Sequence, residues 1–148
     1  MSVHPPFDPG TVEAIARVLG EAGSGTDISR YFQTSGLVDD SGESTKWRRL
    51  NAVFLKSQEA TKSANQILAF VCSYLTPTRF VGKRDEFENH RSELNAVLIL
   101  HGLEYGKDGQ FRHTMQAKTL DEAEGRAQGV RNKLARRNTH AEVYKYCQ

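Results

Sequence analysis

Residues 45–75 read TKWRRLNAVFLKSQEATKSANQILAFVCSYL, and this stretch decides how the rest of the chain folds. It holds the only tryptophan, a dense basic cluster and the longest apolar segment. Apolar residues recur at spacings of three and four in both halves, which is the pattern of helices with one buried face. The stretch therefore predicts two helices that build the core, separated by a break at residues 60–63. Pro77 ends the second of them.

Further helices are predicted on both sides of this pair. Residues 11–22 carry an apolar stripe, and residues 26–34 form a second short helix after a polar cap. Residues 84–101 give the longest pattern after the central pair, and Gly102 closes it. Another helix opens at Thr119 with a narrow, alanine-rich stripe through residue 134. A capping box at residues 139–142 predicts a last helix running to the end of the chain.

One segment favours β structure. Residues 103–105 (LEY) and 110–113 (QFRH) flank the loop GKDG, and an Asp-Gly loop between alternating segments indicates a hairpin. We therefore expect a mainly α fold, an orthogonal bundle of about six helices with one small β-hairpin over residues 103–114. A single domain is predicted over residues 1–148. Its parts are an extended lead-in at 1–9, N-terminal helices at 10–75, and the long helix, hairpin and C-terminal helices at 79–148.

Composition limits the cellular setting. The balance of 38% hydrophobic and 26% charged residues is that of a globular chain rather than a disordered one. Cys72 and Cys147 stand far apart and in no paired motif, so neither a disulfide nor a zinc site is expected. No apolar run reaches the roughly 18 residues of a membrane-spanning helix, and the N-terminus lacks the features of a secretory signal. These features predict a cytoplasmic protein with no membrane partner.

Charge is distributed unevenly along the chain. Residues 1–45 carry a net charge of −5 and residues 46–148 a net charge of +7. The basic cluster formed by Lys46, Arg48 and Arg49 lies in the first turn of a predicted helix that follows a short helix, as in a helix-turn-helix. The connection is longer than that motif normally has, and it carries acidic residues that would repel phosphate. We interpret Lys46, Arg48, Arg49 and Arg79 as candidate contacts to a protein partner or to nucleic acid; a solvated helix face remains a third interpretation.

No catalytic constellation is found. The sequence contains no phosphate-binding glycine loop, nucleophile elbow or dinucleotide fingerprint. Glu86, His90 and Glu93 share one helical face, but a di-metal bundle site needs a second such set, which the sequence lacks. We therefore identify no catalytic, cofactor-binding or metal-binding residue. Enzymatic activity is left open, and a non-enzymatic interpretation is favoured.

Several segments resemble the N-terminal region of the uncharacterised bacterial Ymh-type family, which occurs among mobile-element and phage-defence genes. The most characteristic are TKWRRL (45–50), TPTRFV (76–81) and LNAVL (94–98), and the resemblance spans roughly residues 12–147. Longer members carry a second helical domain. The resemblance therefore implies a sensing or docking part whose C-terminal effector domain is missing here.

The combined prediction is a non-catalytic recognition or adaptor domain that docks a protein partner in a phage-defence or mobile-element setting. The alternative is a nucleic-acid-binding domain that uses the helix-turn-helix-like element around Lys46–Arg49. A homo-oligomer formed through the stripe at residues 120–134 is a further expectation, although the same stripe also suits the bundle core.

Overall fold

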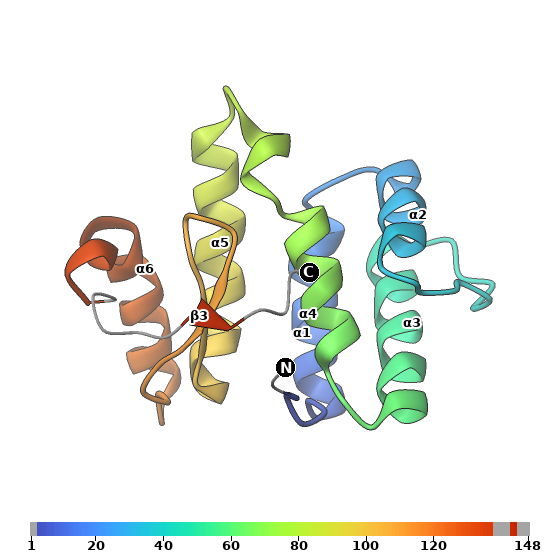
Figure 1. The fold of residues 1–148 in the computed structure, drawn as a ribbon, viewed down its shortest axis with the longest axis horizontal. Helices are drawn as coiled ribbons and strands as arrows, with labels where there is room; N and C mark the ends of the chain where they lie inside the picture. Colours follow the sequence, from blue (N-terminus) through green and yellow to red (C-terminus); the bar gives the residue numbers. More distant parts are fainter. Residues whose placement is uncertain (1–2, 138–142, 145–148) are drawn as a thin grey trace. The chain divides into compact units, whose positions relative to one another are not determined.

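The computed structural model describes residues 3–137 and 143–144, and it divides into two compact units. Unit 1 runs to Thr76 and unit 2 begins at Pro77. The described residues are mainly α-helical, with six α-helices and a small antiparallel sheet (Figure 1). This confirms the predicted fold class. None of the described helices is both long and apolar enough to cross a membrane.

Unit 1 is built from four helices. They are α1 (Pro9–Gly20), α2 (Gly25–Thr34), α3 (Lys46–Thr61) and α4 (Asn65–Tyr74). The side chain of Asp8 caps α1, and Ser24 and Asp27 form a capping box at the start of α2. Between α3 and α4, Lys62 adopts a left-handed backbone with φ of 57°, which produces the predicted break.

The core of unit 1 is aromatic. The ring of Phe70 on α4 lies 5.3 Å from Phe32, 5.4 Å from Phe54 and 5.0 Å from Tyr74, measured between centroids. The Tyr74 hydroxyl donates a hydrogen bond of 2.8 Å to the carbonyl oxygen of Leu19. Helix α1 also packs directly on α3. A β-carbon at Gly20 would lie 3.3 Å from the backbone nitrogen of Trp47, a tight contact that glycine avoids.

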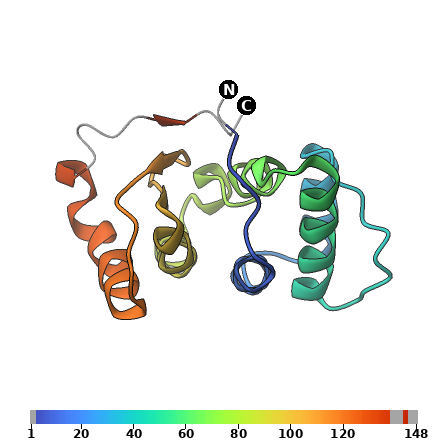
Figure 2. The ribbon, with the colours of Figure 1, turned by 90° about the horizontal axis from the view of Figure 1, so that it is seen from below.

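Unit 2 combines helices with the sheet. Its elements are the short 3-10 helices η1 (Pro77–Phe80) and η2 (Ile99–His101), the helices α5 (Arg84–Leu98) and α6 (Leu120–Arg137), and the strands β1 (Leu103–Tyr105), β2 (Phe111–His113) and β3 (Val143–Tyr144). The hairpin of β1 and β2 packs on α5, and α6 lies along α5 (Figures 1 and 2). Gly102 closes η2 with φ of 73°, the left-handed position predicted for it. Strands β1 and β2 pair antiparallel, so the hairpin prediction is confirmed.

Four local predictions are wrong. Val143 and Tyr144, expected in a helix, form β3, because the outer edge of β2 offers backbone partners to β-prone residues; the capping box at 139–142 lies outside the described residues. Trp47, an apolar residue of the first helix predicted within residues 45–75, was expected on its buried face but is only half-buried. Leu120 is 62% exposed because it stands at the first position of α6, before the helix meets α5. Cys72, for which no disulfide was expected, is half-buried and disulfide-bonded.

Candidate functional site

The first turn of α3 carries three of the four predicted contact residues. Lys46 and Arg48 are exposed, whereas Arg49 is half-buried. Lys46 donates from Nζ to the carbonyl oxygen of Gly23 at 3.1 Å, which fixes its amino group near the end of α1. Arg79, the fourth residue, lies in η1 of unit 2, where its guanidinium stands 5.3 Å from the ring centroid of Phe80. The predicted residues are therefore divided between the two units.

The guanidinium of Arg49 is bonded within unit 1. Its Nε lies 2.8 Å from Oδ2 of Asp39, its Nη1 donates to the carbonyl oxygen of Gly25 at 3.1 Å, and its Nη2 donates to Oγ of Ser29 at 2.7 Å. These bonds tie α3 to the start of α2 and to the loop between them. Arg49 therefore stabilises the fold, and the exposed cations of this turn are Lys46 and Arg48.

Two acidic residues of the loop before α3 are paired with cations of that helix. Asp39 pairs with Arg49, and Asp40 pairs with Lys56 at 2.5 Å. Burial raises the pKa of Asp39, but hydrogen bonds from Ser41 and Arg49 outweigh it, so the pKa lies below its usual value. The hydrogen bond from Lys56 likewise lowers the pKa of Asp40. The loop therefore repels phosphate less than its sequence suggests, but its neutralisation occupies two cations of α3.

Replacing Asp39 with asparagine is expected to lower the free energy of unfolding by about 1.5–3 kcal/mol near neutral pH. The ionised carboxylate has a lowered pKa in the folded state, so its stabilisation is fully present above the unfolded pKa of about 3.9. It is lost as the pH falls through the lowered folded value. Asp39→Asn should therefore match the wild type more closely in strong acid. Urea unfolding at both pH values measures this.

The control is Asp40→Asn, because the pair between Asp40 and Lys56 is exposed at 59% and 63% of its side chains. Exposed pairs contribute little to stability. Equal losses in the two variants near neutral pH would contradict the role assigned to the Asp39–Arg49 pair.

Two arginines lie over the ring of Trp47, and we call Arg17, Trp47 and Arg48 the Trp47 stack. The Arg17 guanidinium carbon lies 3.9 Å from the indole centroid, and that of Arg48 lies 5.3 Å away. Arg17 is also paired with Glu13 at 3.0 Å. The sequence did not reveal Arg17 as part of this surface, because α1 and α3 meet only through tertiary packing. The small residue Gly20, which permits that packing, was the sequence feature that could have indicated that α1 and α3 approach closely here.

The described residues contain no group of three or more histidine, cysteine or acidic side chains placed to hold a metal ion. Comparison of the chain with family models, with curated proteins and with solved structures finds no match.

Proposed function

We propose that this chain is a non-catalytic recognition domain that docks an acidic segment of a protein partner through the Trp47 stack and Lys46. The observation that supports this is the half-buried indole of Trp47, with the guanidinium groups of Arg17 and of the exposed Arg48 over its ring. Tryptophan and arginine are the residue types that contribute most of the binding energy at protein interfaces. The stack also restricts the arginine side chains before binding, which reduces the entropy lost on association.

The charge of this surface favours an acidic partner. Lys46 and Arg48 are exposed and positive, and the nearby Asp39 and Asp40 are paired with Arg49 and Lys56. A partner carboxylate would form charge-assisted hydrogen bonds with the guanidinium of Arg48. An apolar side chain beside that carboxylate would cover the remaining indole surface.

The biological setting follows from the resemblance to the Ymh-type family. We propose a role in bacterial phage defence or in a mobile element, with a C-terminal effector domain or a separate protein as the partner. A cytoplasmic location is part of this proposal. Because disulfides are rare in a reducing cytosol, the disulfide at Cys72 does not support that location, which depends on the resemblance and on the sequence features given above.

Nucleic-acid binding is the competing function. The guanidinium of Arg49 donates hydrogen bonds within unit 1, so Lys46 and Arg48 are the exposed cations of the proposed recognition turn. Two phosphate contacts would give a slope of log affinity against log salt of only about −1.8. That is weak compared with proteins that neutralise many phosphates. The geometry therefore favours a protein partner.

Charge reversal of Arg48 is expected to weaken partner binding at least about tenfold, because it removes a cation and places a carboxylate against an acidic segment. The full chain is used to capture partners from native-host extract. Affinity for each purified candidate is then measured from the fluorescence of Trp47, the only tryptophan. The matched control is Arg30→Glu, since Arg30 is also exposed in unit 1 but lies outside the Trp47 stack.

The two outcomes are distinct. Loss of binding in Arg48→Glu with binding kept in Arg30→Glu supports docking at the Trp47 stack. Equal loss in both variants indicates unspecific attraction and contradicts the proposal. A mixed-sequence DNA duplex is titrated in parallel at several salt concentrations; tight binding of the duplex that Arg48→Glu abolishes would instead establish the competing function.

A further inference from the structure

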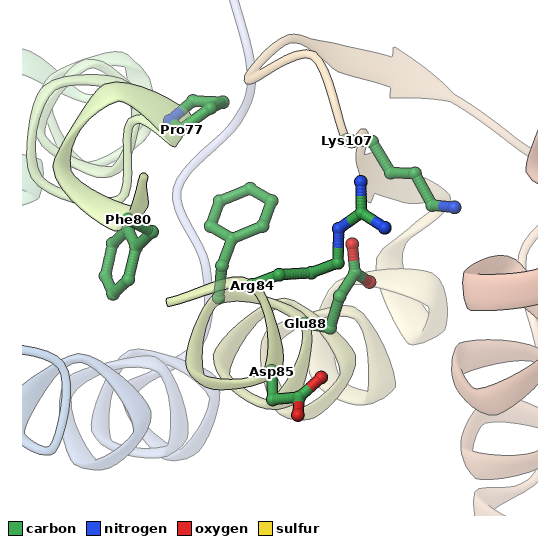
Figure 3. A pocket seen from close by; sticks show the side chains of 7 residues that line it. Pro77, Phe80, Arg84, Asp85, Glu88 and Lys107 are labelled. Carbon is green, nitrogen blue, oxygen red and sulfur yellow. The ribbon is translucent and has the colours of Figure 1, made fainter. Parts of the chain in front are cut away.

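A pocket of about 420 Å³ opens in unit 2. Its lining comes from η1, from the first turns of α5 and from the loop between β1 and β2. The lining residues are Pro77, Phe80, Arg84, Asp85, Phe87, Glu88 and Lys107. In Figure 3 the ends of the Arg84 and Glu88 side chains reach the same part of the pocket, Lys107 runs past them with its amino group directed outward, and Asp85 points the other way.

One side of the pocket is apolar. Pro77, Phe80 and Phe87 supply it, and the centroids of the two phenylalanine rings are 5.5 Å apart. Both rings are largely buried, with 8% and 6% of their surface exposed, so they are held in place. Flat apolar walls of this kind suit an aromatic or heterocyclic ring, which can stack or pack edge-on against them.

The other side of the pocket is positively charged. Arg84 and Lys107 are exposed, and neither forms an ion pair with any described residue. The negative charge of Glu88 is balanced by an ion pair, because its Oε2 lies 2.8 Å from Nη2 of the buried Arg91. Two cations from separate elements therefore face a pocket in which the inward carboxylate is already paired. This charge balance favours an anion.

The position of Lys107 opposite Arg84 is set by buried hydrogen bonds. Arg91 donates from Nη1 to the carbonyl oxygen of Tyr105 at 2.9 Å, and Asn95 both donates to that oxygen at 3.0 Å and accepts from the Tyr105 amide at 2.7 Å. These bonds fasten β1 to α5. Gly109 has φ of 76°, and a β-carbon there would lie 2.9 Å from Cδ of Pro77, so the loop also packs on η1. The pocket is therefore formed before any ligand binds.

We propose that this pocket binds a small organic anion that carries a flat ring, with a phosphate or carboxylate between Arg84 and Lys107 and the ring against Phe80 and Phe87. The volume lies within the usual range for small-molecule sites, which is about 300–1,000 Å³. Neither the apolar wall alone nor the two cations Arg84 and Lys107 alone would select such a ligand. Their combination distinguishes it from inorganic anions and from neutral rings.

The test uses phenyl phosphate, which combines one ring with one phosphate. The full chain, labelled with ¹⁵N, is titrated and the amide resonances are followed by NMR. Inorganic phosphate and benzyl alcohol are titrated separately as the anion alone and the ring alone. The variants are Arg84→Gln and Lys107→Gln. The matched control is Lys118→Gln, because Lys118 is an exposed lysine of the same unit that does not line the pocket.

The expected result is saturable shifts at the amides of residues 80–88 and 107 with phenyl phosphate, and weaker binding of either fragment. Each pocket variant should reduce the affinity about tenfold, the effect of losing one charge-assisted contact. Lys118→Gln should leave the affinity unchanged. The proposal is overturned if inorganic phosphate binds as tightly as phenyl phosphate, if the shifts do not saturate, or if Lys118→Gln weakens binding as much as the pocket variants do.

Discussion

Replacing Arg91 with alanine is expected to lower the free energy of unfolding of unit 2 by about 3–5 kcal/mol, the cost of breaking a buried ion pair. Arg91 is 1% exposed, and its partner Glu88 has 12% of its side chain exposed. The variant leaves the Glu88 carboxylate without its cation and removes one of the donors to the Tyr105 carbonyl oxygen. Urea unfolding followed by circular dichroism, with hydrogen exchange at the Tyr105 amide, measures the loss.

A double variant separates the charge effect from simple loss of packing. Arg91→Met with Glu88→Gln removes both charges and keeps most of the side-chain volume. Because Nε of Arg91 is buried without a hydrogen-bond partner among the described residues, the native pair already carries a desolvation cost. The double variant should therefore recover most of the stability that Arg91→Met alone loses. If Arg91→Ala left the unfolding midpoint unchanged, the site would have to be hydrated, and the role given to Arg91 would be wrong.

The elements of the fold that follow from local chemistry were predictable. The helices could be placed because apolar stripes and polar caps act over a few residues, although α2 begins at Gly25 after the Ser24 cap, slightly earlier than predicted. The hairpin was predictable because the loop GKDG supplies Gly109 at a left-handed position.

The features that depend on distant residues were not predictable. Lys46, Arg48 and Arg49 look alike in sequence, but only Arg49 reaches Asp39 and the start of α2, because side-chain direction depends on how α2 and α3 pack. Strand β3 was missed because a local capping pattern competed with pairing to a strand some thirty residues earlier. The pocket at Arg84 and Lys107 was missed for the same reason, since its lining comes from three elements that pack in space.

The second large effect is expected in unit 1, where replacing Phe70 with alanine should cost about 3–5 kcal/mol of unfolding free energy. Phe70 is fully buried and touches three other aromatic rings. Those rings come from α2, α3 and α4, so the space left by Phe70 cannot close unless several helices move together. The measurement is urea unfolding followed by circular dichroism and by the fluorescence of Trp47, which reports on the same unit.

Tyr31→Ala is the control for Phe70→Ala, because the Tyr31 ring is only half-buried and meets the cluster edge-on, 5.9 Å from Tyr74. Truncating a ring that water already reaches opens no closed cavity, so the cost should be clearly smaller. The loss of unfolding free energy in Phe70→Leu should lie between those of Phe70→Ala and Tyr31→Ala, since leucine keeps apolar volume but loses the ring contacts. Equal costs for Phe70→Ala and Tyr31→Ala would mean that the cluster repacks freely. In that case residues 45–75 would supply apolar surface to unit 1 without fixing how its helices pack.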